Sequence, residues 1–110
     1  MKKIVKNIKK TCANRKGDFA EYYAVTWLWD NGYEVFQNSG CSGPVDMIAM
    51  DKKGKIILID VKTLKKDNRY KPKSYNCTGH TRTKKQISLG VQILLFHPET
   101  RDLRFSEHKE

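Results

Sequence analysis

The stretch from Pro44 to Lys62 constrains the fold of this chain more than any other. Val45–Met50 is a short apolar run, and Asp51–Gly54 supplies residues that favour turns. Ile56–Ile59 is a run of mostly β-branched side chains, which are enriched in strands. This pattern predicts two strands joined by a tight turn.

Two carboxylates interrupt this apolar hairpin. Asp46 lies near the start of the first strand, and Asp60 lies at the end of the second. Lys62 follows two residues later and therefore points to the same side of the strand as Asp60. Buried charges are costly unless they are paired or bind a metal. The three side chains thus predict a site for Mg²⁺ or Mn²⁺. The alternative is an edge hairpin with a solvated ion pair, which contributes little.

The charge of the chain points to a polyanionic partner. The 110 residues include 22 Lys and Arg but only 12 Asp and Glu, which gives a formal net charge of +10. This length suits one domain with a single core. DNA is the natural partner of such a surface, although a basic surface can also serve only to keep a protein in solution. No apolar run reaches the roughly 20 residues of a membrane span, and the N-terminus lacks the apolar centre of a signal peptide. We therefore expect a cytoplasmic protein.

The N-terminal half predicts a basic arm followed by a long helix. Residues 1–13 form the expected arm, and residues 14–110 form the expected domain. The helix should run from Asn14 to Asn31, with Gly32 ending it as a left-handed cap. Its small and apolar residues share one face with Glu21. A buried glutamate needs a partner, so either Glu21 reaches the site at Asp46 and Asp60, or the helix is rotated to expose it.

The remaining segments complete an α-β-β-β-α-β-β order. This order predicts an α/β domain with a mixed central sheet flanked by helices. The expected segments are a strand at Tyr33–Gln37, a Gly/Ser loop at Asn38–Pro44, an irregular loop at Thr63–Gly79, a helix at Thr81–Leu89, and strands at Val91–Phe96 and Leu103–Phe105.

Basic residues of the second half are the expected DNA contacts. Those of the irregular loop alternate with tyrosines, which can stack on bases or donate hydrogen bonds. A solvated loop is the alternative. The expected DNA-binding residues are Lys65, Lys66 and Arg69 in the loop, and Arg82, Lys84, Lys85 and Gln86 in or beside the second helix.

The order of these motifs resembles the PD-(D/E)xK nuclease superfamily. A helix glutamate, Glu21, precedes Pro44-Val45-Asp46 and then Asp60-Val61-Lys62. Within that superfamily the chain is most similar to the archaeal-type Holliday junction resolvases, over roughly residues 14 to 66. The matching stretches are Arg15-Lys16-Gly17 through Glu21, Gly32-Tyr33-Glu34-Val35, Ser42, Val45-Asp46-Met47-Ile48-Ala49, and Asp60-Val61-Lys62-Thr63 with Lys65-Lys66.

The resemblance implies a restriction-endonuclease-like fold and a role for each matched residue. Glu21, Asp46 and Asp60 would bind the metal together with the carbonyl of Val61, and Lys62 would be the catalytic lysine. Further implied site residues are Ser42, as the loop serine needed for cleavage, Lys65, near the scissile strand, and Gln86, as a polar residue near the site. The resemblance also implies a homodimer whose two sites cut symmetric strands of a four-way junction.

Departures from the resolvase pattern leave other functions open. The resolvases carry an arginine where this chain has Gln37-Asn38, and residues 81–105 do not match them clearly. The opening Lys-Gly-Asp-x-Ala-Glu and the ending Val-Lys-Thr also resemble the homing endonucleases associated with group I introns. We expect a Mg²⁺-dependent junction resolvase. The alternatives are a homing or restriction-type endonuclease and a non-catalytic basic DNA-binding module.

Overall fold

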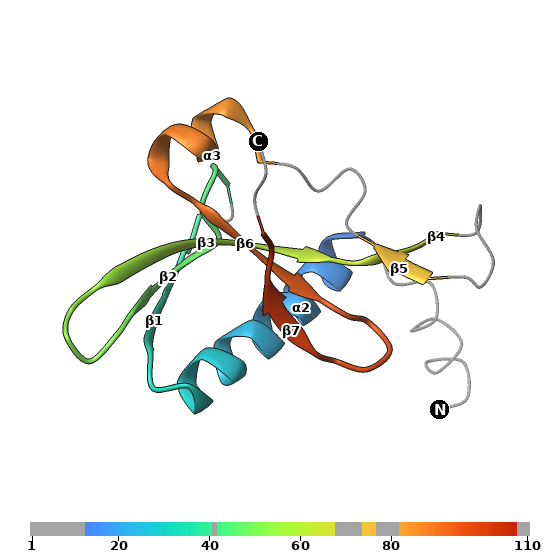
Figure 1. The fold of residues 1–110 in the computed structure, drawn as a ribbon, viewed down its shortest axis with the longest axis horizontal. Helices are drawn as coiled ribbons and strands as arrows, with labels where there is room; N and C mark the ends of the chain where they lie inside the picture. The colour runs from blue at the N-terminus through green and yellow to red at the C-terminus, as the bar shows by residue number, and fades with distance from the viewer. Residues whose placement is uncertain (1–12, 41, 68–73, 77–81, 108–110) are drawn as a thin grey trace.

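The computed structural model describes residues 13–40, 42–67, 74–76 and 82–107 of the chain. Residues 1–12 of the expected basic arm and the expected DNA contact Arg69 lie outside this part. The structure is a single α/β domain, as predicted (Figure 1). In chain order its elements are α2 (Ala13–Asp30), β1 (Glu34–Gln37), β2 (Met47–Met50), β3 (Ile56–Thr63), β4 (Lys65–Asp67), β5 (Ser74–Asn76), α3 (Lys84–Leu89), β6 (Gln92–Phe96) and β7 (Leu103–Phe105).

Five strands form a mixed sheet in the order β1-β2-β3-β6-β7. β3 and β6 run parallel, and the other neighbouring strands of this sheet run antiparallel. The predicted hairpin is present: β2 pairs with β3, with Met47 opposite Ile59 and Met50 opposite Ile56. The mixed sheet predicted from the order of the segments is therefore confirmed.

The turn between β2 and β3 is held by one carboxylate. Asp51 Oδ1 accepts hydrogen bonds from the backbone N–H groups of Lys53, at 2.8 Å, and Lys55, at 2.9 Å. Gly54 has a φ of 88°, a conformation that side chains with a Cβ rarely adopt. The turn residues seen in the sequence thus fix the register of the hairpin.

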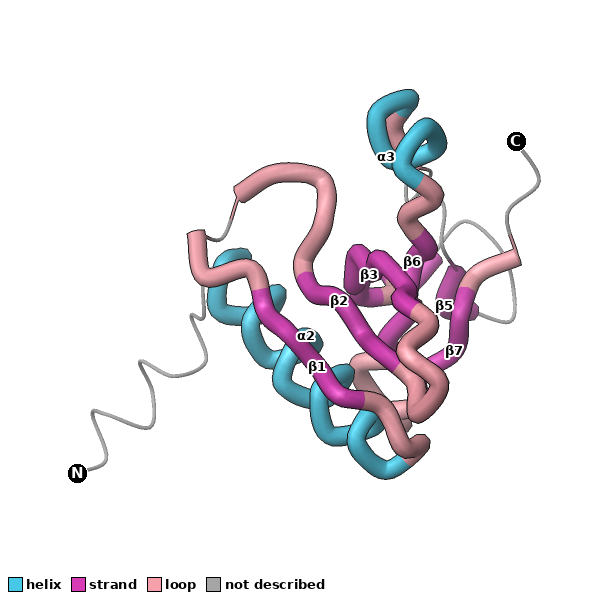
Figure 2. The backbone as a smooth tube through the Cα atoms, turned by 90° about the vertical axis from the view of Figure 1, so that its left-hand side faces the viewer, coloured by secondary structure: helices cyan, strands magenta, loops and turns pink. Residues whose placement is uncertain are grey.

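Helix α2 covers one face of the sheet. Its buried residues, Ala20, Ala24, Val25 and Leu28, are each no more than 7% exposed, which confirms most of the predicted helix face. Ala24, Val25 and Leu28 pack against four residues of the sheet, namely Met47, Ala49, Ile59 and Leu94. Gly32 ends the helix with a φ of 86°, as expected. Figure 2 shows α2 lying along one side of the strands, so the core of the domain lies between α2 and this face.

The segment expected to be irregular contains a second, two-stranded sheet. β4 and β5 pair antiparallel, with Lys65 opposite Asn76 and Asp67 opposite Ser74. The prediction of an irregular loop was therefore wrong for these six residues. Neither Lys65-Lys66-Asp67 nor Ser74-Tyr75-Asn76 has an alternation of apolar residues in its sequence, so no period of two predicts these strands. No helix in the part of the chain that the structure describes is long and apolar enough to cross a bilayer.

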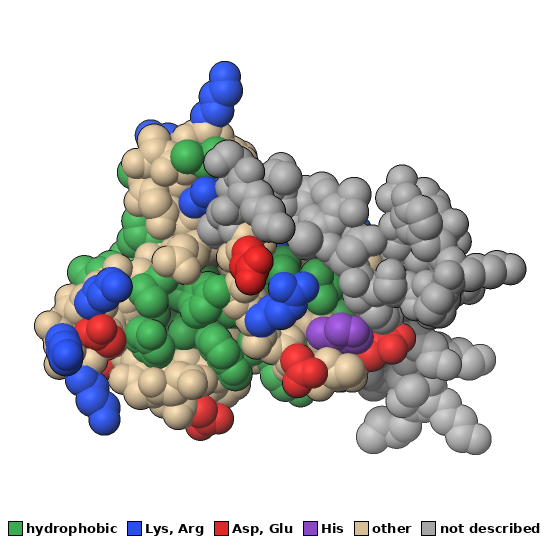
Figure 3. Space-filling view, in the orientation of Figure 1, with side chains coloured by type: hydrophobic (Ala, Val, Ile, Leu, Met, Phe, Trp, Pro, Cys, Tyr) green, Lys and Arg blue, Asp and Glu red, His purple; other side chains and the backbone are tan. Residues whose placement is uncertain are grey.

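The second face of the sheet is visible in Figure 3, which has the orientation of Figure 1 with α2 behind the strands. Apolar side chains gather on this face over β2 and β3. Helix α3 lies at one end of it and contributes to the site described next.

Candidate active site

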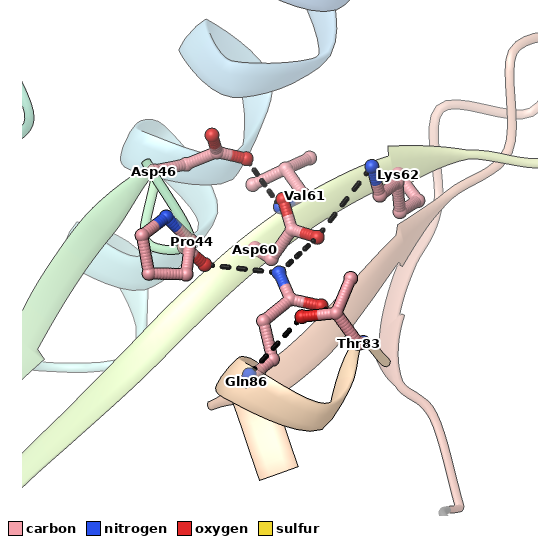
Figure 4. Close-up of polar contacts among 7 residues, drawn as sticks. All are labelled: Pro44, Asp46, Asp60, Val61, Lys62, Thr83 and Gln86. Atoms are coloured by element: carbon pink, nitrogen blue, oxygen red, sulfur yellow. Dashed lines mark hydrogen bonds and ion pairs between the residues drawn. The ribbon is translucent and has the colours of Figure 1, made fainter. Parts of the chain in front are cut away.

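Asp46 is held at the entry of β2 by backbone hydrogen bonds on both sides. Its N–H donates to the carbonyl of Ile59 at 2.8 Å, and its carbonyl accepts from the N–H of Asn38 at 2.9 Å. Asp46 therefore continues the ladder one residue before β2 begins. Its Oδ2 accepts a hydrogen bond of 2.7 Å from the backbone N–H of Val61 (Figure 4). That bond fixes the carboxylate of one strand against the backbone of the next.

Asp60 and Lys62 lie beside each other near the end of β3. Asp60 is only 6% exposed, and the Nζ of Lys62 lies 3.5 Å from its Oδ2. Alternation along the strand accounts for this arrangement, since residues two apart share a side. The sequence predicted this pair of side chains correctly. A buried carboxylate with a partly exposed ammonium beside it is not the solvated surface pair of the alternative interpretation.

Gln86 of α3 completes the surroundings of Asp60. Its Nε2 donates to Asp60 Oδ2 at 3.0 Å and to the carbonyl of Pro44 at 2.9 Å. Its Oε1 accepts from the N–H of Thr83 at 3.0 Å, and Thr83 Oγ1 accepts from the N–H of Gln86 at 3.1 Å, which forms a capping box. The sequence placed Gln86 among the expected DNA contacts, and the resemblance implied that it is a polar residue near the site. In the structure Gln86 is buried, at 6% exposed, beside Asp60.

The three acidic residues of the predicted site influence one another. Burial raises the pKa of Asp46 to about 7, together with a side-chain hydrogen bond to Asp60 and the charges of Asp60 and Glu21, while the Val61 N–H opposes this shift. The pKa of Glu21 is also raised, first by burial and then by the charges of Asp18 and Asp60. Glu21 on α2 is thus close enough to Asp46 and Asp60 for their charges to interact.

The donor chemistry of this cluster fits a divalent cation. Carboxylate oxygens are the ligands that Mg²⁺ and Mn²⁺ prefer, and a cation would relieve the repulsion that raises the pKa of Asp46. Asp46, Asp60 and Glu21 are the residues that would hold it. Within the described residues, no three carboxylate, imidazole or thiol side chains already have the arrangement of a preformed metal site. The three side chains thus match the cation in charge and in donor type, but not yet in a three-ligand arrangement.

The other predicted site residues lie in the loop before β2, in β4, and in or just before α3. Ser42 is exposed in the loop before β2, and its carbonyl accepts a hydrogen bond from Asn38 Nδ2. Arg82 donates from its guanidinium to the carbonyl of Val91 at 3.1 Å, so it tethers α3 to the start of β6. Three of the predicted DNA contacts have exposed side chains, namely Lys65, Lys84 and Lys85. For Lys66 the structure describes only the backbone, in β4.

Two contributors to the site were missed in the sequence. Asn38 organises the loop before β2, because its Nδ2 donates to the carbonyls of Ser42 and Val45 and its Oδ1 accepts from the N–H of Gly40. Pro44 accepts the second hydrogen bond of Gln86. An asparagine at the start of a Gly/Ser loop is the available signal for the first, since such side chains often bond to nearby backbone groups. The Pro44 carbonyl has no sequence signal.

No protein family and no curated protein matches the sequence of this chain. A solved structure does match it. The chain is similar to the bacterial homing endonuclease I-Ssp6803I, with a TM-score of 0.62 and 16% sequence identity, over 86% of this chain and 64% of that one. The likeness shows the fold. It is a likeness to a homing endonuclease and does not support the narrower resemblance to Holliday junction resolvases.

Proposed function

We propose that this chain is a metal-dependent DNA endonuclease of the homing or restriction type. The observation that carries the proposal is the pair formed by the partly exposed Asp46, just before β2, and the buried Asp60 on β3, with Lys62 3.5 Å from Asp60. A non-catalytic DNA-binding module gains nothing from carboxylates that repel its ligand. The net charge of +10 supports a polyanionic substrate.

In the proposed reaction each residue has a separate task. Asp46, Asp60 and Glu21 hold a Mg²⁺ or Mn²⁺ ion, with the Val61 carbonyl as a further donor; such an ion activates water and stabilises charge on a phosphoryl group. Lys62 supplies a positive charge near the phosphate that is cut. Gln86 is a positioning residue, because it fixes Asp60 Oδ2 through a hydrogen bond of 3.0 Å. Ser42 and Lys65 are proposed to contact the DNA backbone on either side of the carboxylates.

The structural likeness to I-Ssp6803I favours a duplex substrate over a four-way junction. The chain spans 64% of the length of that endonuclease, so its substrate remains part of the proposal. A junction resolvase is the second candidate, because the stretch over roughly residues 14 to 66 resembles the resolvases in sequence. Either activity would require a homodimer if both strands are cut symmetrically.

The test is a cleavage assay with purified protein and Mg²⁺. Supercoiled plasmid libraries, linear duplexes and an immobile four-way junction are compared, with Asp60→Asn as the inactive variant and Asp30→Asn as the matched control. Asp30 is an exposed carboxylate at the end of α2. Cleavage of particular duplex sequences supports the proposal, whereas paired nicks in the junction alone would move the function to the resolvase type. Full activity of Asp60→Asn would remove the proposed active site.

A further inference from the structure

An exposed arginine in the turn between β6 and β7 is held against helix α2. The guanidinium carbon of Arg101 lies 4.6 Å from the ring centroid of Phe19 and 5.1 Å from that of Tyr23. At such distances a ring face attracts a cation. The Nη1 of Arg101 also donates a hydrogen bond of 2.9 Å to the Tyr23 hydroxyl. We call these three residues the arginine cradle, because the two rings fix the direction of the guanidinium.

The rings of the cradle are packed on the core. The ring centroid of Phe96, a residue that is only 2% exposed, lies 5.3 Å from that of Tyr23 and 6.3 Å from that of Phe19. Phe19 and Tyr23 are four residues apart on α2, so they are neighbours on its surface, and their centroids are 5.0 Å apart. The surface on which Arg101 lies is therefore rigid.

The backbone of Arg101 has an unfavourable conformation. Its φ is 69°, and among the described residues other than glycine it is the one with a positive φ. The turn holds it there, since the Arg101 N–H donates to the carbonyl of His97 at 2.8 Å and the His97 N–H donates to the carbonyl of Asp102 at 2.9 Å. Exposed ring contacts offset a strain of this size only roughly. Residues with such backbone strain are found most often at functional sites.

The charge of Arg101 remains available to an anion. Among the described residues, the side-chain contacts of this guanidinium are with two rings and a hydroxyl, and none is with a carboxylate. Glu99 and Asp102 are exposed in the same turn, yet the guanidinium lies on the rings. A guanidinium that stacks through its face keeps N–H donors at its edge, and their fork geometry matches a phosphate group.

The cradle lies at the edge of the sheet that carries the proposed active site. β3 and β6 run parallel, with Lys62 opposite Leu95 and Thr63 opposite Phe96. Figure 1 shows both strands leading toward the same side of the domain. The turn of Arg101 follows β6 there. The helix that supplies the cradle rings also supplies Glu21. A duplex bound over the carboxylates is thus close to the cradle.

We propose that Arg101 binds a phosphate of the DNA backbone at a distance from the bond that is cut. The choice of DNA as the anion rests on the proposed function. The rings already restrict the arginine side chain, so less of its freedom is lost when a phosphate binds. Phosphate contacts position a duplex without reading its sequence. Arg101 therefore orients the DNA relative to the acidic residues.

The test measures binding of a labelled duplex by fluorescence anisotropy in EDTA, over a range of salt concentrations. The variant is Arg101→Gln. The matched control is Lys53→Gln, which removes one exposed charge from the turn between β2 and β3, at the other end of β3 from Lys62. Each phosphate contact contributes about 0.9 to the slope of log Kobs against log salt. We expect Arg101→Gln to lose about this much slope and about tenfold in affinity, and the control to lose less than half of either.

A second variant separates binding from the anchoring of the turn. Glycine adopts a positive φ without strain, so Arg101→Gly should stay folded in urea denaturation and lose the same slope. If both Arg101 variants are less stable but keep the wild-type slope, Arg101 only anchors the turn to α2 and the inference is overturned. An equal loss of slope in Lys53→Gln would also overturn it, because net charge alone would then explain the effect.

These results are distinguishable from a failure of the proposed function, because binding in EDTA requires no cleavage. A protein that cuts no DNA but loses slope in both Arg101 variants would keep the phosphate contact and remove the nuclease. A protein that cuts DNA and binds it equally well with and without the Arg101 side chain would keep the nuclease and remove the contact.

Discussion

Replacing Asp46 with asparagine should abolish cleavage and yet make the metal-free protein more stable at pH 8. Asparagine keeps an oxygen that can accept the 2.7 Å hydrogen bond from the Val61 N–H. It removes the charge that burial, Asp60 and Glu21 disfavour. The folded protein without metal therefore carries at Asp46 a repulsion that the variant lacks, and only the wild type can use that charge to bind a cation.

The size of the effect follows from the pKa of Asp46. In the folded protein the pKa is raised from 3.8 to about 7, which corresponds to an upper limit of about 4 kcal/mol at 1.36 kcal/mol for each pH unit. Asp46 is partly exposed, and solvent screens such interactions. We therefore expect the free energy of unfolding of Asp46→Asn at pH 8 to exceed that of the wild type by about 1–2 kcal/mol.

The sign of the pH dependence can be stated in advance. Between pH 4 and 7 the folded wild type holds a proton on Asp46 that the unfolded chain has released. The free energy of unfolding contributed by this group therefore falls as pH rises through that window, and it is flat above about pH 8. At pH 5 most folded molecules carry the proton but most unfolded chains have already released it, so roughly 40% of the advantage that the variant has at pH 8 should remain there.

Urea denaturation in EDTA at pH 5 and pH 8 measures these free energies by linear extrapolation. Asp30→Asn is the control, since that carboxylate is exposed. Adding Mg²⁺ or Mn²⁺ at pH 8 should stabilise the wild type, because the ion binds only the folded state, and should do little for Asp46→Asn. The reasoning would be refuted if the variant were less stable than the wild type at pH 8, or if its advantage were the same at both pH values.

The other predictions concern neighbouring residues and use cleavage and binding assays. Asp60→Asn should abolish cleavage but bind DNA as tightly as the wild type or more tightly, and a parallel loss of binding in fluorescence anisotropy would contradict this. Lys62→Ala should lower kcat by at least 100-fold with little change in KM, because its charge acts in the transition state; a change confined to KM would make it a binding residue. Gln86→Leu leaves Asp60 and Pro44 without their shared donor, so it should destabilise the protein by about 1–3 kcal/mol and lower kcat. At pH 5, Gln86→Glu should destabilise the protein less than Gln86→Leu does. Raising salt should weaken DNA binding steeply through counterion release, and a flat response would argue against a phosphate-binding surface.

The parts of the site that could be predicted from the sequence are those determined by local rules. The period of two along β3 places Asp60 and Lys62 on one side, and the turn at Asp51 brings Asp46 against the same strand. Each of these relations spans fewer than twenty residues. For Glu21 the sequence left two arrangements open, because a glutamate on an otherwise small and apolar helix face can either reach the site or be exposed by a rotation of the helix.

The contacts that could not be predicted join distant segments. Gln86 reaches Asp60 across 26 residues and Pro44 across 42, and its type alone does not distinguish a buried amide from a DNA contact. Its place depends on how the segment between β3 and β6 returns to the sheet, and that path passes through β4 and β5, which carry no apolar period. The tertiary connection, rather than the propensity of any residue, decides the neighbours of Asp60.

These distant contacts explain how the chain tolerates a repulsive cluster. Asp46 and Asp60 would separate if their side chains were free, but the Val61 N–H holds the first and Gln86 holds the second. Gln86 is itself fixed by the capping box with Thr83, so the position of Asp60 depends on the start of α3. Backbone and amide donors keep the carboxylates in place without neutralising them. Asp46 and Asp60 are therefore each held in place without a cation, and the charge that lowers the stability of the folded chain remains available to bind one.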